Sequence, residues 1–240
     1  MGLQNKRVVV IGGTSGIGLA VAQAAIAHGA VVVVGSSSAG KVAAASDQLA
    51  GSEALTIDVK DEASVEAFFE RVGALDHLVF TAGDWSRFGG GPIEKLDVAG
   101  AASVFAVRFW GAITAIKHAA PRIREGGSIA LTDGMIAHRA RKGAAISTAM
   151  AGAVEHLTRA LAVDLAPIWV NAVCPGAIRT DVWNVIPAEQ REERIKRMTE
   201  RLPIKRIGEP DEVAEAYLYL MRGGYTTGQV LRVDGGQTAI

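Results

Sequence analysis

The chain has 240 residues, which is enough for a large core and within the size of one α/β domain. Lys+Arg and Asp+Glu both number 25, and this balance argues against a general nucleic-acid binder, which needs a basic excess. A hydrophobic content of 49% argues against a disordered chain.

The first elements predicted are a strand, a glycine-rich turn, a helix and a second strand. Residues 8–11 are a β-branched run closed by glycine, which is typical of a strand buried on both faces. Residues 19–28 are Ala-rich with apolar residues at helical spacing, and Gly29 follows as a C-terminal glycine should. Residues 31–34 are predicted as the second strand, which Gly35 ends.

The same alternation of strands and helices continues to the C-terminus. Further strands are predicted at residues 55–57, 77–80, 128–131, 169–173 and 229–233. Helices are predicted at residues 65–72, 98–119, 147–165, 189–201 and 210–221. Such alternation implies a parallel sheet covered on both faces, and right-handed crossovers make it doubly wound. No linker or repeat divides the chain, so we expect a single α/β domain over residues 1–240.

The sequence shows no clear signal for a membrane span, secretion or a metal. We find no apolar run of roughly 18 residues, and the N-terminal residues lead straight into a strand. The single Cys174 cannot form an internal disulfide, and its apolar surroundings predict a small core residue. No metal-ligand spacing is formed by His28, His77, His118 and His156. We therefore expect a cytoplasmic protein that uses no metal and no nucleic-acid partner.

The turn after the first predicted strand has the composition of a phosphate-binding loop. Its glycines have the spacing G-x-x-x-G-x-G, and the loop includes Gly12, Thr14, Ser15, Gly16, Ile17 and Gly18. Glycine lets the backbone approach a pyrophosphate, and the helix N-terminus that follows offers free N–H groups. A glycine triad alone also suits a tight turn, but its place between a strand and a helix favours dinucleotide binding.

Further motifs give the chain a specific family resemblance. After the glycine pattern come Asp58-Val59, Ala82-Gly83, the segment 171–180 and the ending 228–236. In this order and spacing the chain resembles the short-chain dehydrogenase/reductase family from about residue 6 to the C-terminus. The resemblance implies a Rossmann fold with a seven-stranded parallel sheet and a nicotinamide dinucleotide as cofactor.

The resemblance also implies a role for each matching position. Asp58 would hydrogen-bond the adenine amino group, and Val59 would lie beside the ring. The ribose side of the cofactor would be lined by Ala82 and Gly83. The nicotinamide carboxamide and its face would be held by Pro175, Gly176, Ile178 and Thr180.

The end of the second strand bears on the choice of dinucleotide. A carboxylate there would bond the ribose 2′-hydroxyl of NAD and repel the 2′-phosphate of NADP. We place this position at Gly35, and Ser36, Ser37 and Ser38 follow it, with Lys41 one helical turn further on. Hydroxyls, free N–H groups and a cation suit a phosphate, although the serines equally suit a cap on the next helix. We predict that NADP(H) is favoured over NAD(H).

The residues that do the chemistry in this family are missing. The resemblance implies a Tyr as acid or base, a Lys four residues later that lowers its pKa, a Ser that orients the carbonyl and an Asn in a proton relay. Aligned on residues 157–162, these positions hold Ser147, Ala151, Gly134 and Arg108. None of the three tyrosines is followed four residues later by Lys, and all lie near the C-terminus: Tyr217, Tyr219 and Tyr225.

Other polar residues follow the predicted strands, at the edge where open α/β sheets bind ligands. They are Asp133, His138, Arg139, Arg141 and Lys142 after the fifth strand, with Asp84, Trp85 and Arg87 after the fourth. In one interpretation His138 or Asp133 donates a proton and Arg108 polarises a substrate oxygen or pairs with a carboxylate. Ser147 is a weaker candidate, because an alkyl hydroxyl is a poor acid without an activating neighbour.

Two other interpretations stay open. The chain could bind the cofactor without turnover, as a sensor or as the structural partner of an active homologue. Alternatively, Arg108 and Asp133 could form an ion pair that fills the vacated pocket. In either case residues 189–201 predict an exposed lid helix, with Trp183 and Met198 facing a ligand or packing beneath it. The small, flat faces of helices 101–119 and 147–165 predict a homotetramer or homodimer.

Overall fold

The apolar runs of the sequence form one seven-stranded parallel sheet. The computed structural model describes residues 2–83 and 90–240. The strands are β1 (Arg7–Ile11), β2 (Val31–Ser36), β3 (Glu53–Thr56), β4 (Leu75–Phe80), β5 (Ile123–Thr132), β6 (Trp169–Pro175) and β7 (Val230–Val233). They lie in the order β3-β2-β1-β4-β5-β6-β7, and each neighbouring pair is parallel. The doubly wound Rossmann topology predicted from the sequence is confirmed.

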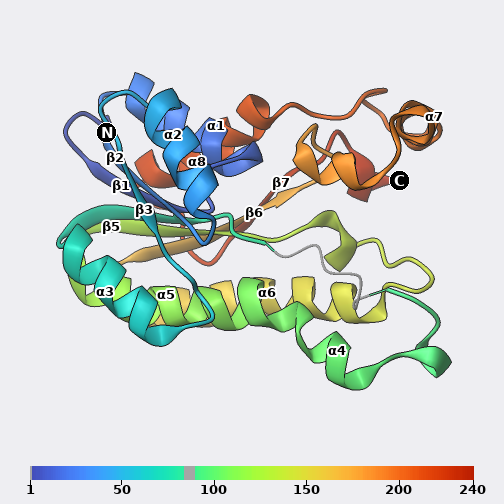
Figure 1. Ribbon diagram of the computed structural model, residues 1–240, viewed down its shortest axis with the longest axis horizontal. Coiled ribbons are helices and arrows are strands. Elements are labelled where there is room, and N and C mark those ends of the chain that lie inside the picture. The colour runs from blue at the N-terminus through green and yellow to red at the C-terminus, as the bar shows by residue number, and fades with distance from the viewer. Residues whose placement is uncertain (1, 84–89) are drawn as a thin grey trace.

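Helices cover both faces of this sheet (Figure 1). One face carries α1 (Gly16–Ala27), α2 (Ala39–Gln48) and α8 (Pro210–Arg222). The other carries α3 (Glu62–Val72), α5 (Ala112–Ala119) and α6 (Ala145–Asp164). The short α4 (Val98–Ala102) precedes α5, and α7 (Ala188–Thr199) lies between β6 and α8 in the chain.

The central strand β1 is apolar from Val8 to Ile11 because both of its faces are buried. In β1, Val9 and Ile11 belong to the core cluster under α3, α5 and α6, whereas Val8 and Val10 belong to the cluster under α1 and α8. Successive side chains of a strand point to opposite faces, so a strand between two helix layers needs an apolar residue at every position. Each fully buried side chain of this size contributes on the order of 1.5–3 kcal/mol.

Several predicted elements have different bounds in the structure, and two of these differences bear on the site. The second strand does not end at residue 34, because β2 continues through Gly35 to Ser36. Gly35 is packed inside the sheet layer, where an added Cβ would lie 2.7 Å from Cγ2 of Ile57. The long helix predicted over residues 98–119 is divided into α4, a π-helical segment (Ala106–Gly111) and α5.

The helical stretch Val98–Arg122 meets a membrane criterion that we did not expect. Over its 25 residues it is long and apolar enough to cross a bilayer, by length and composition only. Core helices meet the same criterion, and in this fold Ala112, Ala115 and Ile116 of the stretch belong to the main core cluster. The stretch is thus part of the helix layer on one face of the sheet.

Buried His77 should make the fold sensitive to acid. Its side chain is 2% exposed in β4, and its Nδ1 lies 2.9 Å from the hydroxyl of Ser128 in β5. Burial lowers the pKa of His77 to about 4. An unfolded His takes up a proton near pH 6.5, so stability is lost between about pH 6.5 and 4, by about 1.4 kcal/mol per pH unit.

We therefore expect a His77→Gln variant to lack this contribution to the pH slope. Urea denaturation of wild type and variant at about pH 6.5 and 4.5 measures it as a change in their stability difference. The exposed His28→Gln change serves as the control. Parallel curves for wild type and His77→Gln would show that another group sets the acid response.

Candidate active site

The turn between β1 and α1 can be built only from glycine at two positions. Gly12 has a φ of +89°, and a Cβ there would lie 2.5 Å from the backbone nitrogen of Ala82 at the end of β4. A Cβ on Gly18 would overlap the carbonyl oxygen of Gly12. These contacts bring β1, β4 and α1 together tightly and leave bare backbone at the edge of the sheet. Such a surface fits the close approach of a pyrophosphate.

The N-terminus of α1 opens onto a cavity beside this turn. Ser15 is the residue before the helix, its side chain caps no backbone N–H, and the first turn contains no acidic residue. The N–H groups at this end can therefore bind an anion. The cavity has a volume of about 370 Å³ and is bounded by Thr14, Ser15 and Gly16 on one side and by Thr180 and Asp181 on the other. The structure thus brings together the glycine loop and the segment after β6 that we predicted to bind the same cofactor.

The other predicted cofactor positions also lie at the carboxyl ends of strands. Asp58 and Val59 follow β3, Ala82 and Gly83 follow β4, and Pro175 and Gly176 end or follow β6. Val59 is buried against Gly111 of the π-helical segment. The Ile17 side chain packs on the core cluster beneath α1, and Ile178 is buried with it. Ile178 also pairs with Gly208 in an isolated bridge.

The serine run lies where a cofactor's 2′ substituent is expected. Ser36 is the last residue of β2, so it, and not Gly35, occupies the end of that strand. Ser38 caps α2 by accepting a hydrogen bond of 3.3 Å from the backbone N–H of Lys41, and Ser37 is exposed. One serine therefore has the capping role that the sequence left open. No carboxylate stands at either candidate strand end.

Arg108 reaches the end of β4 from the π-helical segment. A Cβ added to Gly83 would lie 2.7 Å from Nε of Arg108, so the guanidinium lies directly against Gly83. π-Helical turns inside α-helices are frequent at functional sites, because the extra residue reorients side chains. Here the segment places a cation beside a position where the resemblance implies cofactor.

Four ionisable groups meet between the ends of β5 and β6 and helix α6. They are Asp133 directly after β5, His138 in the segment that follows, Glu155 in α6 and Cys174 in β6. One polar atom from each lies within 4.8 Å of the others. Thr132 of β5 pairs with Val173 of β6, so Asp133 and Cys174 come next in register and lie on the same face of the sheet, toward α6. From the sequence we predicted Asp133 and His138 as site residues and no metal-ligand set, so this grouping of four potential ligands was missed.

Glu155 is the functional candidate that the sequence analysis did not find. It lies on the helical face of Ser147 and Ala151, because the three are spaced i, i+4 and i+8. That spacing is the signal that could have identified it. Ser147 is half-buried near the start of α6, whereas Ala151 and Glu155 are buried.

Burial dominates the electrostatics of this cluster. Asp133 is 2% exposed, and burial, followed by its hydrogen bond with Glu155, raises its pKa to about 8. Burial also raises the pKa of the Cys174 thiol, with Asp133 adding to the effect. At neutral pH, therefore, Asp133 is held as a carboxylic acid and Cys174 as a thiol.

The imidazole of His138 is held between a cation and a carboxylate. A guanidinium nitrogen of Arg232 in β7 lies 3.4 Å from Nδ1, and Nε2 lies 2.6 Å from Oε1 of Glu155. The contact between Nε2 and Glu155 has the distance of an ion pair but not the alignment of a hydrogen bond. Arginine can only donate, so Nδ1 accepts and the ring proton is on Nε2, the nitrogen that faces Glu155.

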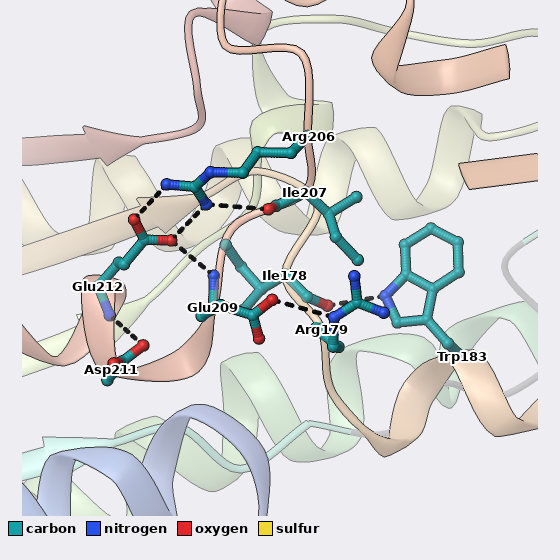
Figure 2. Close-up of polar contacts among 8 residues, drawn as sticks. All are labelled: Ile178, Arg179, Trp183, Arg206, Ile207, Glu209, Asp211 and Glu212. Atoms are coloured by element: carbon teal, nitrogen blue, oxygen red, sulfur yellow. Dashed lines mark hydrogen bonds and ion pairs between the residues drawn. The ribbon is translucent and has the colours of Figure 1, made fainter. Parts of the chain in front are cut away.

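Polar contacts hold together the chain between β6 and α8, the segment that contains the predicted lid helix (Figure 2). Nε of Arg179 lies 3.0 Å from Glu209, and the indole N–H of Trp183 donates to the carbonyl of Ile178 at 2.7 Å. A bidentate pair between Arg206 and Glu212, with distances of 2.6 and 2.7 Å, closes the far side.

Helix α7 lies within this segment and is mostly exposed, as predicted. A cavity of about 270 Å³ lies under it and is lined by Trp183 together with Arg179 and Arg191. Trp183 is anchored through its N–H and borders this cavity, so a ligand-facing role for it stays a prediction. Met198 is half-buried in α7.

Comparison with known proteins decides the family. Residues 12–238 match the family model described as enoyl-(acyl carrier protein) reductase. The short-chain dehydrogenase/reductase malC of Malbranchea aurantiaca is 34% identical over 253 residues, which cover 98% of this chain and 95% of malC. The chain belongs to the short-chain dehydrogenase/reductase family.

Other members of the short-chain dehydrogenase/reductase family agree in sequence and in structure. Cis-4-hydroxycyclohexanecarboxylate dehydrogenase of Sinomonas cyclohexanicum is 36% identical, over 97% of this chain and 96% of that enzyme. A small-chain dehydrogenase crystallised in complex with NADPH is 35% identical, with a TM-score of 0.86 over 99% of this chain and 100% of that chain. The structure of MalC Reductase/Diels-Alderase from Malbranchea aurantiaca gives a TM-score of 0.91 at 32% identity, covering 99% and 97% of the two chains. Membership and fold together establish an oxidoreductase-type protein of this family with an NAD(P)-binding fold.

All three tyrosines lie in the described part of this short-chain dehydrogenase/reductase, and none stands at residue 147. Tyr217 is fully buried on α8, on the opposite face of the sheet from α6, and its hydroxyl lies 2.7 Å from that of Thr132. The Thr132 hydroxyl donates to the carbonyl of Phe80, so the Tyr217 hydroxyl donates to Thr132. The side chains of Tyr219 and Tyr225 are exposed.

The position aligned with the family's Ser is open. A Cβ added to Gly134 would meet no atom within 4 Å, so the missing hydroxyl leaves space at this point. Asp133 is the neighbouring residue, but its side chain points toward α6, and both of its carboxyl oxygens are sealed from solvent. Residues Asp84, Trp85 and Arg87, which the sequence also brought to this edge, lie outside the described residues.

Proposed function

We propose that this chain is an NADP(H)-dependent carbonyl/alcohol oxidoreductase whose acid is Asp133 with His138, in place of a tyrosine. The observation that carries the proposal is the burial of Asp133 next to the open position of Gly134, and this burial raises the pKa of Asp133 to about 8. An acid with a pKa near the working pH is suited to proton transfer. NADPH, when bound, supplies a hydride to the substrate carbon.

The residues of the chain would then supply the remaining parts of the reaction. Arg108 would polarise the substrate oxygen, or pair with a carboxylate of the substrate, from its place against Gly83. The acid group would deliver a proton to the oxygen as the hydride arrives at carbon, so that ketone, NADPH and one proton yield alcohol and NADP⁺. The half-buried Ser147 near the start of α6 would orient the substrate.

A panel of ketones, followed through NADPH absorbance, tests this function. It should include 4-oxocyclohexanecarboxylate and cyclohexanone, because a relative is named for a hydroxycyclohexanecarboxylate and Arg108 could pair with the carboxylate. We expect Asp133→Asn or His138→Ala to lower kcat by about 10²–10⁴-fold. Glu70→Gln, an exposed change in α3, is the matched control. Turnover unaffected by both active-site changes would remove these residues as donors.

A second function is favoured by the burial of both carboxyl oxygens of Asp133. Because neither of its oxygens reaches solvent, the chain could instead bind the cofactor without turnover, as a sensor or as the partner of an active homologue. Tight NADPH binding without turnover of any ketone, together with stable co-purification with an active relative, would support it.

The serine run supports NADP(H) as the cofactor, and Ser36 offers the test. Ser36 ends β2, where a carboxylate would repel a 2′-phosphate and accept from a 2′-hydroxyl. We expect Ser36→Asp to weaken NADPH binding by about 10-fold or more and to improve NADH binding, by fluorescence titration. Ser36→Asn, which adds similar bulk without charge, is the control. Equal losses for both cofactors would place the phosphate elsewhere.

We further propose a homotetramer or homodimer formed through α5 and α6, in the cytoplasm. Large apolar side chains remain exposed on this helix layer, with Trp110 at 60% and Val163 at 77%. Exposed apolar groups of this size are typical of interfaces. Light scattering of the purified protein tests the assembly, and a monomer at micromolar concentration would contradict it.

A further inference from the structure

Two carboxyl groups meet in the interior of this protein. Asp133 is 2% exposed and Glu155 is 5% exposed. Their side-chain oxygens lie within 4.8 Å of each other, in the cluster that also holds His138 and Cys174. Two carboxylate charges this close in a low-dielectric interior repel strongly. The pair must therefore hold a proton or a cation.

The hydrogen bonds of the pair indicate a proton. Both side-chain oxygens of Asp133 and Oε1 of Glu155 are buried without a hydrogen-bond partner among the described residues. Side-chain oxygens of Asp133 and Glu155 lie within 4.8 Å of each other, so the other carboxyl group is the available partner for a hydrogen bond. A carboxylate carries no hydrogen to donate, so this bond requires one proton between the two groups.

The surrounding charges place the proton on Asp133. Glu155 faces two nitrogen groups, since Nε2 of His138 lies 2.6 Å from Oε1 and a guanidinium nitrogen of Arg159 lies 3.6 Å from Oε2. Asp133 faces Cys174, whose burial keeps it a neutral thiol. Asp133 lacks such a nitrogen partner in the described contacts of this cluster.

Other charged groups near the cluster act at longer range. Arg232 of β7 contacts the far side of the His138 ring, and Asp234 after β7 acts on Cys174. Tyr217, which is buried on α8, interacts electrostatically with Asp133 and Arg108. None of these groups replaces the direct contacts of Glu155.

Exposure rises along one direction through the cluster. Both oxygens of Asp133 are sealed, the Glu155 side chain is 7% exposed, and the His138 side chain is 22% exposed. His138 carries its ring proton on Nε2, toward Glu155, and Arg232 fixes this orientation from the other side. His138 is thus the member of the series in contact with water.

From these contacts we propose that Asp133 and Glu155 share one proton, and that Glu155 and His138 carry it between Asp133 and solvent. The use of this proton in catalysis rests on the proposed function. During carbonyl reduction the O–H bond of Asp133 breaks as the substrate O–H bond forms. Asp133 then regains a proton from water through His138 and Glu155, which returns each group to its starting charge. Glu155 is a positioning residue in this scheme, because it acts through Asp133.

A metal ion is the alternative occupant of the cluster. The same four side chains are a possible ligand set for a divalent cation such as Zn²⁺. Ligation would need the lone pair of Nε2, however, and the Arg232 contact with Nδ1 places the ring proton on Nε2. The geometry therefore favours the proton, and the metal becomes an outcome of the test.

Infrared spectroscopy of the full chain tests the shared proton without requiring turnover. The C=O stretch of a protonated carboxyl should be present at about pH 7 and should disappear as the pH rises through about 8. Asp133→Asn should lack this band. Glu155→Gln should lose the band at a lower pH than wild type, because the amide carries no charge beside Asp133 and can donate to its ionised form. The exposed Glu70→Gln change should retain it.

Three results would overturn the proposal. They are a wild-type spectrum without the band at about pH 7, a band that survives Asp133→Asn, and one bound metal ion per chain that is lost in Cys174→Ser. Should Asp133→Asn fail to fold by circular dichroism, Glu155→Gln still decides the matter through the pH at which the band is lost. A carboxyl band without turnover would contradict only the proposed function. Turnover without the carboxyl band would contradict only the proposal of a shared proton.

The path to solvent has its own readout once a substrate is found. His138→Ala should slow turnover, and added imidazole should restore much of the lost rate by entering the vacated space. Glu155→Gln should move the pH profile of kcat/KM toward lower pH, because it lowers the pKa of Asp133. A pH profile unmoved by Glu155→Gln would overturn the positioning role.

Discussion

Asp133→Asn should make the protein more stable at about pH 8, although it removes a buried hydrogen-bonding acid. Folded Asp133 has its pKa raised from 3.8 to about 8, so between these values the folded state holds a proton that the unfolded state has lost. Stability therefore falls as the pH rises through this window, by about 1.4 kcal/mol per pH unit, and stays low above it. An amide has no proton to lose, and its NH₂ group can still donate to Glu155.

The pH range for this measurement follows from the two buried groups with opposite slopes. Below about pH 6.5 the unfolded state takes up a proton on His77 that the folded state does not, so this group lowers stability as the pH falls. The loss offsets the stability that the protonated Asp133 contributes to the folded state. Between about pH 6.5 and 8, Asp133 is the one of these two groups that makes stability depend on pH. Urea denaturation over this range should show wild type losing about 2 kcal/mol while Asp133→Asn stays nearly flat. The exposed Asp47→Asn change should follow wild type. Parallel curves for wild type and Asp133→Asn would show that Asp133 ionises normally in the folded protein.

The fold could be predicted from the sequence because its signals are local. Each central strand is a short apolar run, since both faces are buried, and glycine follows the strands that lead into turns. The end of β2 was misplaced because a glycine after an apolar run, such as Gly35, is typical of the end of a strand. In the fold it is a packing position, where Ile57 leaves no room for a Cβ. That contact comes from a different part of the chain and has no local sequence signal.

The cofactor side of the site was predicted better than the catalytic side for the same reason. The glycine turn between β1 and α1 is contiguous in sequence, so its spacing is visible directly. Glu155 becomes notable only when α6 packs its face against the ends of β5 and β6, where Asp133 and Cys174 already lie. Within the sequence it reads as one acidic residue in an Ala-rich helix. Burial of a charge is a tertiary property, and it is burial that gives Asp133 an unusual pKa.

Gly18→Ala should abolish dinucleotide binding even though it adds a single methyl group. Its Cβ would overlap the carbonyl oxygen of Gly12 and crowd the hydroxyl of Thr81. Gly12 cannot move away easily, because its backbone already packs against Ala82 at the end of β4. Backbone atoms held by the sheet cannot relax as a flexible side chain would, so the loop must shift out of the shape that admits a pyrophosphate. Overpacking of this kind costs about 1–3 kcal/mol in stability as well.

A matched control separates loss of the site from a general effect of glycine replacement. Gly40 in α2 has no atom within 4 Å of an added Cβ and no positive φ, so Gly40→Ala should stabilise its helix by about 0.5–1 kcal/mol. NADPH fluorescence titration should show wild-type affinity for Gly40→Ala and a loss of about 100-fold or more for Gly18→Ala. Circular dichroism should show the sheet and helices retained in both. Equal NADPH affinities for the two variants would mean that the pyrophosphate does not lie on this turn, and the site would then have to be sought elsewhere along the edge of the sheet.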